Sequence, residues 1–342
     1  MFKPQPNNHN GAHHHHHPHH HSGHHLHGVI DPAITTTERG IWAVKWSFVA
    51  LFITALLQLG VTALSGSVAL LADTIHNFGD AATAMPLWIA FTLARRRPTQ
   101  RFTYGLGRVE DLAGVVIVFI ILFSALVAGY ESLERFFNPR QVTYVGAVAA
   151  ASLIGFLGNE AVAIFRLRVG KEIGSAALIA DGYHARADGL TSLAVLLGAL
   201  GVWLGYPLAD PLIGLLITVA IFRIVWQSAR SIFTRLLDGV DPGLIDEIRH
   251  AAGHAPQVEG VTEVRVRWLG HRLHAEVNIT VRPGLTVEEA HHIAVEARHQ
   301  LMHHLGYLSN ATIHVDPASA PGETHHHLLE HTHDDLPSHS HH

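Results

Sequence analysis

The sequence predicts an α-helical membrane protein, with six transmembrane helices followed by a small cytoplasmic α+β domain. The chain of 342 residues is 48% hydrophobic and only 15% charged, whereas about a quarter of the residues in an ordinary soluble domain are charged. Six long apolar stretches lie between Ile41 and Leu236. After Asp238 the pattern changes to short helical and alternating segments, which are typical of a soluble domain.

Each apolar stretch is long enough to cross a bilayer. A hydrocarbon core of about 30 Å requires about 20 helical residues. The stretches are continuously apolar rather than alternating, so helices are expected and not a barrel. They comprise residues 41–64, 68–94, 112–134, 142–165, 174–204 and 208–236.

The basic residues predict the orientation of these helices. The links at 65–67 and 205–207 carry no charge, whereas basic residues follow the even-numbered stretches. The positive-inside rule therefore places both termini and the even-numbered loops in the cytoplasm. The basic residues that follow the second stretch are Arg95, Arg96, Arg97, Arg101 and Arg108, those that follow the fourth are Arg166, Arg168 and Lys171, and Arg230 and Arg235 lie at the end of the sixth.

The C-terminal part reads as a compact α-β-β-α-β unit, which predicts a ferredoxin-like domain. A helix is expected from Asp241–Pro242 to about Ala252, and strands at 261–268, 273–281 and 311–315. Between the last two strands, Thr286 and Glu289 form the capping box of a helix that runs to about Leu305. The expected organisation is a His-rich tail (1–36), the transmembrane domain (37–237), the cytoplasmic domain (238–317) and a second His-rich tail (318–342).

Histidine is the outlier of the composition. The 32 histidines fall into groups of 12, 12 and 8, of which the first and last lie in the terminal tails. The absence of cysteine excludes disulfides and thiolate metal sites. His-rich tracts bind zinc, nickel or cobalt weakly, so the tails either buffer or report metal or are dispensable. The net charge of −5 gives no reason to expect a nucleic-acid partner.

One motif, A-D-x-x-H-x-x-x-D, occurs in both the second and the fifth stretch, at residues 72–80 and 180–188. Helical spacing places His and Asp of each copy on one face. Two such helices supply two imidazoles and two carboxylates, a set suited to tetrahedral zinc. Ionisable residues inside a membrane are costly and usually functional. The expected metal ligands are His76, Asp80, His184 and Asp188. Asp73 and Asp181, one turn earlier, either orient the histidines or have a structural role.

Other functions fit this pattern less well. An intramembrane metalloenzyme would also use His and Asp, but the H-E-x-x-H string of zinc proteases is absent. A membrane-anchored metal sensor or storage protein would suit the His-rich tails, yet it does not require two buried His/Asp pairs. The histidines could also simply form hydrogen bonds between helices.

These features together resemble the cation diffusion facilitator family. Beside the doubled motif, the resemblance is carried by S-G-S-V-A-L-L-A-D at 65–73, Y-G-L-G-R-V-E at 104–110 and I-H-V-D-P at 313–317. It implies a homodimeric metal/proton antiporter and not an enzyme. The short, compact loops favour the inner membrane of a bacterium as its location. The implied partners are divalent metal ions, protons and the lipid bilayer, with no obligatory cofactor. Zinc is the favoured substrate and a candidate regulatory ion, while cobalt, nickel and iron stay open.

The resemblance also implies sites outside the quartet. Cytoplasmic metal ligands would be His291, His314 and Asp316, aided by His274 or His292. Because Thr262 and Asn278 stand where relatives have histidine, a binuclear site is doubtful. Thr99, Phe102 and Leu106 cannot bind zinc, so no site is expected in the loop after the second helix. Arg108 and Asp238 correspond to a charge pair that locks the dimer of relatives. Asn159 and Glu160 either line the pathway or form hydrogen bonds between helices.

Overall fold

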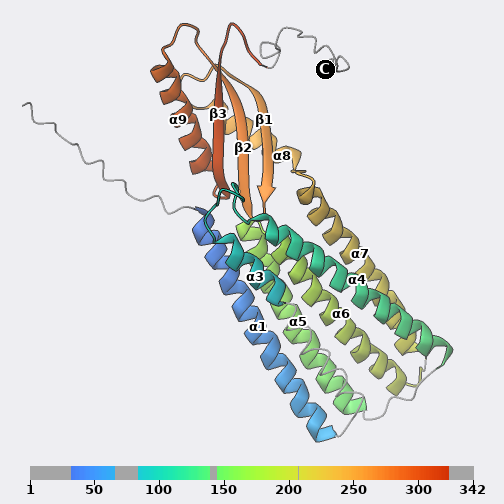
Figure 1. Ribbon diagram of the computed structural model, residues 1–342. Helices are drawn as coiled ribbons and strands as arrows, with labels where there is room; N and C mark the ends of the chain where they lie inside the picture. The colour runs from blue at the N-terminus through green and yellow to red at the C-terminus, as the bar shows by residue number, and fades with distance from the viewer. Residues whose placement is uncertain (1–31, 66–83, 139–144, 207, 323–342) are drawn as a thin grey trace, which may run out of the picture. The chain divides into compact units, whose positions relative to one another are not determined.

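The computed structural model describes residues 32–65, 84–138, 145–206 and 208–322 (Figure 1). Five helices in these ranges are long and apolar enough to cross a membrane, which confirms five of the six expected spans. The second stretch is described only from the short helix α3 (Ala84–Ala94) onward. The five long helices are α1 (Pro32–Ser65), α4 (Arg108–Phe137), α5 (Val145–Ile173), α6 (Ala176–Trp203) and α7 (Ala209–Leu236).

The link between α5 and α6 is shorter than the sequence predicts. Helix α5 continues past the apolar stretch to Ile173, so Arg166 and Lys171 lie within the helix and not in a loop. Only Gly174 and Ser175 separate the two helices. Gly174 has a φ of +70°, a conformation that glycine adopts without strain. The Oγ of Ser175 then accepts a hydrogen bond from the backbone N–H of Leu178 at 3.0 Å and caps α6.

Small residues allow α5 and α6 to pack closely. A Cβ atom added to Gly182 would lie 2.9 Å from Cγ of Leu167 and 3.1 Å from its backbone nitrogen. A Cβ added to Gly170 would lie 3.0 Å from the backbone nitrogen of Ile179. Helix packing in membranes commonly uses such positions, because van der Waals contact rather than hydrophobicity drives the association. Helix α5 also packs against α1, and α4 packs against α6 and α7.

The cytoplasmic domain has the expected α-β-β-α-β order. Strands β1 (Gly260–Leu269) and β2 (Arg272–Val281) are antiparallel, and β3 (Leu308–Pro317) is parallel to β2 in the sheet order β1-β2-β3. The third strand is longer than predicted, because its pairing with β2 extends over both of its ends. Whether the domain is ferredoxin-like stays an expectation.

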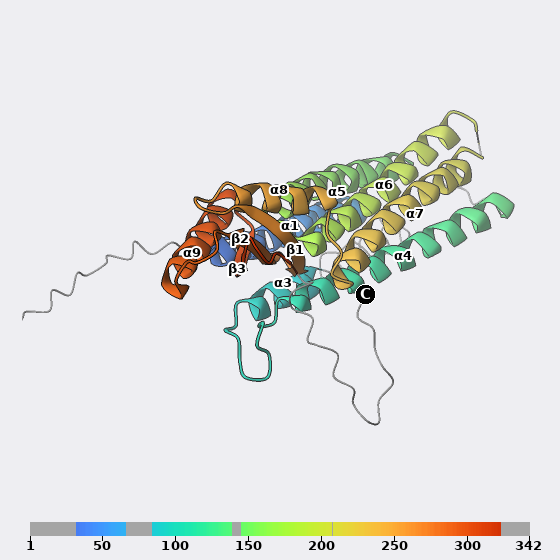
Figure 2. The ribbon, with the colours of Figure 1, turned by 90° about the horizontal axis from the view of Figure 1, so that it is seen from above.

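Two helices cover this sheet. Helices α8 (Pro242–Gly253) and α9 (Val287–His304) contact each other as well as the strands (Figure 2). Alternate residues of β2 are buried and form the core with both helices. Asp241 caps α8, and the capping box of Thr286 and Glu289 begins α9, so both predicted helix starts are confirmed.

Candidate functional site

Helix α6 places the second copy of the His/Asp motif inside the bundle. The side chains of Asp181, His184 and Asp188 are at most 9% exposed. Nδ1 of His184 lies 3.6 Å from Oδ2 of Asp188, one turn later on the same face. Tetrahedral zinc with ligand bonds of about 2.0–2.1 Å holds neighbouring ligand atoms about 3.3 Å apart. The two side chains are therefore nearly positioned to bind one ion together.

The first copy of the motif lies outside the described residues. His76, Asp80 and Asp73 fall in the range 66–83, so the four-ligand site stays a prediction. Among the residues that the structure does describe, no three of His, Asp and Glu form a group that could hold a metal ion.

Asp181 forms an ion pair with a residue of α5 that the sequence predicts to lie in a cytoplasmic loop. Nη1 of Arg166, on α5, lies 3.0 Å from Oδ2 of Asp181 and donates to its carbonyl oxygen at 3.3 Å. Both side chains are fully buried. Interpreting Arg166 as a cytoplasmic loop residue was therefore wrong: it is a buried cation that neutralises a buried carboxylate. The signal was available, because a carboxylate expected inside a membrane needs a partner of opposite charge.

A second ion pair joins the same two helices beside the motif. Arg186 of α6 donates from Nη2 and Nε to the carboxylate of Glu160 at 2.6 and 3.2 Å. This confirms that Glu160 bonds to a neighbouring helix. Asn159 is buried, and its Cβ lies against Gly189 of α6; whether it lines a pathway stays a prediction.

The structure brings Arg108 and Asp238 together, as the family resemblance implies. Arg108, the first residue of α4, forms an ion pair with Asp238 just after α7 and donates to the carbonyl oxygen of Leu236 at 3.3 Å. This contact lies within one chain, and the role of the pair in a dimer stays a prediction.

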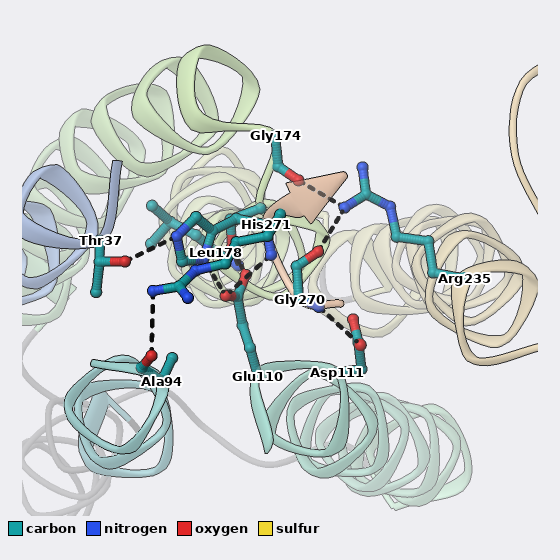
Figure 3. Close-up of polar contacts among 11 residues, drawn as sticks. Thr37, Ala94, Glu110, Asp111, Gly174, Leu178, Arg235, Gly270 and His271 are labelled. Atoms are coloured by element: carbon teal, nitrogen blue, oxygen red, sulfur yellow. Dashed lines mark hydrogen bonds and ion pairs between the residues drawn. The ribbon is translucent and has the colours of Figure 1, made fainter. Parts of the chain in front are cut away.

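The tip of the β1–β2 hairpin inserts among the helix ends, an arrangement that no pattern in the sequence predicts (Figure 3). Nδ1 of His271 lies 2.6 Å from Oε2 of Glu110 in the first turn of α4, and Nε2 lies 2.9 Å from Oγ1 of Thr37 on α1. His271 and Glu110 are each 1% exposed. The hairpin of the cytoplasmic domain is thus bonded to two helices of the bundle.

Glycine and arginine complete this joint, by which we mean the contacts of hairpin residues 270–272 with the helix ends. Gly270 donates to Oδ2 of Asp111 at 3.1 Å, and its φ is +64°. A Cβ at this position would lie 2.6 Å from the carbonyl oxygen of Gly107, so only glycine fits. Nη1 of Arg235, near the end of α7, donates to the carbonyl oxygen of Gly270 at 3.5 Å and to that of Gly174 at 2.5 Å.

A chain of hydrogen bonds connects the joint to α6. Ser175 donates to Oε1 of Glu110 at 2.5 Å and accepts from the first turn of α6. Glu110 therefore contacts both the hairpin and the N-cap of the helix that carries His184. The sequence signal for this role was the pair of adjacent acidic residues, Glu110 and Asp111, in the first turn of a mainly apolar helix.

The candidate cytoplasmic ligands are only partly assembled. Nε2 of His314 lies 3.0 Å from Oδ1 of Asp316 on β3. His291 is exposed on α9, with its ring centroid 6.5 Å from that of His292. Within the described part of one chain His291 does not complete a three-ligand group with His314 and Asp316. A site formed by these residues in a dimer stays a prediction.

Comparison with known proteins covers both domains. A family model described as "Cation efflux transmembrane domain" matches residues 44–237, and one described as "Cation efflux protein, cytoplasmic domain" matches residues 240–318. A protein of Mycobacterium tuberculosis named as a probable cation efflux system protein is 54% identical over 295 residues, which are 86% of this chain and 89% of the relative.

Two further relatives have names that specify a metal. The zinc transporter ZitB of Escherichia coli is 30% identical over 278 residues, which are 77% of this chain and 87% of the relative. The manganese efflux system protein MneP of Bacillus subtilis is 26% identical over 292 residues, which are 82% of this chain and 98% of the relative.

Proposed function

Because this chain belongs to the cation efflux family, that of the cation diffusion facilitators, we propose that it exports divalent transition-metal cations, zinc first among them, in exchange for protons. The observation that carries the proposal is the pair His184 and Asp188, buried one turn apart on α6 with ligand atoms 3.6 Å from each other. His76 and Asp80 repeat the same spacing in the sequence and would complete the four ligands.

The chemistry of these ligands supports the coupling to protons. A metal ion binds neutral imidazole and ionised carboxylate, so protons compete with it for the same atoms. An unperturbed histidine titrates near pH 6.5, within the range that a gradient across a bacterial inner membrane spans. Ligands facing the cytoplasm, where both termini would lie, take up metal in their deprotonated form. Ligands facing the other side exchange the metal for protons.

The choice of zinc rests on the donor set and on similarity. Two imidazoles and two carboxylates suit tetrahedral zinc, and the relative ZitB is named a zinc transporter. Imidazole also binds cobalt, nickel and iron, and another relative is named for manganese. The preference for each ion can be ranked by measuring how strongly it competes with zinc for uptake.

Proteoliposomes test the function and its site together. Zinc uptake is measured with and without an imposed pH gradient for the full chain, for His184→Ala/Asp188→Ala and for His76→Ala/Asp80→Ala. Tyr183→Phe, next to His184 on α6, is the matched control. Gradient-driven uptake that both double variants lose and the control keeps is the expected result. Uptake that ignores the gradient contradicts antiport, and zinc binding without uptake favours the sensor or storage function.

A further inference from the structure

A pocket with a partly polar lining lies among α4, α6 and α7, in the half of the bundle away from the cytoplasmic domain. Its polar lining comprises Glu131, Ser132, Arg135, Thr191, Asp210 and Thr218. The joint contacts α4 at Glu110, and Arg135 follows 25 residues later, which is about 37 Å along a helix. Asp210 lies in the first turn of α7, whose other end reaches the joint through Arg235 and Gly270. The pocket is therefore near the opposite ends of these helices.

The pocket begins beside the proposed transport site. Thr191 follows Asp188 by three residues on α6, so the two side chains share a face and are about 4.5 Å apart along the helix axis. A cation that leaves Asp188 on the side away from the cytoplasmic domain would therefore meet the polar groups of this pocket next.

The hydroxyl groups of the pocket are oriented to accept, not to donate. Ser132 donates to the carbonyl oxygen of Ala128 at 2.7 Å, and Thr218 donates to that of Gly214 at 2.8 Å. Thr191 donates in the same way to Ala187 at 3.0 Å. Each hydroxyl has one proton, so its oxygen presents only lone pairs to other groups. With the carboxylates of Glu131 and Asp210, the lining offers oxygen acceptors that suit a divalent cation or its hydration shell.

An ion pair lies across the pocket. Nη1 of Arg135, on α4, donates to Oδ2 of Asp210, on α7, at 3.2 Å, and Nη2 lies 3.8 Å from the carboxylate of Glu131. The guanidinium group of Arg135 is thus bound to the same carboxylates that an outgoing cation would contact. Its long side chain can move away when a divalent ion competes for them.

We propose that this pocket is the route by which the metal cation leaves the transport site, and that the Arg135–Asp210 ion pair closes it. The inference rests on the proposed function and specifies the path by which the metal ion leaves the protein. The alternative is that the ion pair only holds α4 and α7 together. In that case water and ions from the aqueous phase need not reach the interior of the pocket.

The absence of native cysteine allows a direct test. Ala194→Cys in the full chain, at a pocket-lining position whose side chain is buried, is treated with a charged, membrane-impermeant thiol reagent from either side of the membrane. We expect modification only from the side away from the cytoplasmic domain. Leu197→Cys is the matched control, because this α6 side chain is exposed on the bundle exterior and faces lipid in a membrane. Val195→Cys, which also lines the pocket, serves if Ala194→Cys does not fold.

The gate is tested in the same background. Asp210→Asn should raise the modification rate about fivefold, the factor that corresponds to an ion pair of about 1 kcal/mol. Arg39→Gln breaks an ion pair with Glu172 elsewhere in the bundle and should leave the rate unchanged. Zinc should slow the modification, and this protection should disappear in His184→Ala/Asp188→Ala.

The outcomes separate this inference from the proposed function. A pocket cysteine that reacts no faster than the lipid-facing control in every variant overturns the exit route. A rate unaffected by Asp210→Asn overturns the gate. Zinc uptake by the cysteine-free parent is measured independently, so a chain that transports zinc with an unreactive pocket retains its function and loses only this route.

Discussion

Nδ1 of His271 lies 2.6 Å from Oε2 of Glu110, which joins the hairpin tip of the cytoplasmic domain to the first turn of α4. Glu110 also accepts from Ser175, the N-cap of α6. One carboxylate therefore bonds the cytoplasmic domain and the helix that carries His184. A movement of the hairpin would change the support of that helix end directly.

Loss of His271 should destabilise the protein strongly. His271→Ala leaves the buried carboxylate of Glu110 without its imidazole partner, and a hydrogen bond to a charged group contributes about 1.5–3 kcal/mol. Adding Glu110→Gln should recover part of this loss, since the uncompensated charge is then gone. Thermal unfolding of the purified protein measures both, with the exposed His292→Ala as the control. Additive losses in the double variant would contradict the coupling.

Arg166→Met should be far more harmful than Arg168→Met. Arg166 is fully buried against Asp181, whereas Arg168, two residues on, is exposed on the same helix. Removing one partner leaves a buried charge and costs about 3–5 kcal/mol; an exposed arginine contributes at most about 1 kcal/mol. The yield of folded protein and its unfolding temperature report the difference. Equal effects would show that the buried pair does not stabilise α5 against α6.

Gly182→Ala should separate α5 from α6. The added Cβ would lie 2.9–3.1 Å from two atoms of Leu167, one of them backbone. Overpacking of this kind costs about 1–3 kcal/mol. Gly60→Ala on α1 is the matched control, since nothing lies within 4 Å of its Cβ, and alanine there should not destabilise. Unfolding temperatures of the two variants test this, and zinc uptake should fall only for Gly182→Ala.

The stability of the cytoplasmic domain should fall between neutral and mildly acidic pH because of His274. Burial, and then the positive charges of Arg267 and Arg272, lower the pKa of His274 below its usual 6.5. The unfolded chain therefore binds the proton more readily than the folded one, and stability decreases as pH falls below about 6.5. His274→Gln should remove this part of the pH dependence, whereas His292→Gln should not. Unfolding measured from pH 8 to 5 would contradict the assignment if His274→Gln kept the wild-type slope.

The ion pair of Arg108 and Asp238 should support the dimer that the family resemblance implies. Arg108→Asp places two acidic side chains together where the helices meet the cytoplasmic domain and should promote dissociation. The exchanged variant Arg108→Asp/Asp238→Arg should restore the dimer, because the charges are again opposite. Mass measured by light scattering in detergent decides this. A monomeric wild-type protein would refute the role.

Periodicity and local spacing in the sequence were sufficient to predict many of the helices and their starting residues. Apolar length predicts a membrane helix because the hydrocarbon thickness sets the number of residues, and five described helices agree. The starts of α8 and α9 follow from the side chains of Asp241 and Thr286, which satisfy backbone groups only a few residues away. The pairing of His184 with Asp188 is likewise a property of one helical turn.

The tertiary structure decided which distant charges meet. Composition identified Arg166 only as a basic residue at the end of an apolar run, and its burial follows from Asp181 on another helix. Glu110 and His271 are 161 residues apart in the chain, and no local pattern relates them. The pocket closed by Arg135 and Asp210 depends in the same way on the packing of α4 against α7. Helical period and capping act within a few residues, whereas buried charges are compensated by whichever side chains the folded chain brings into contact.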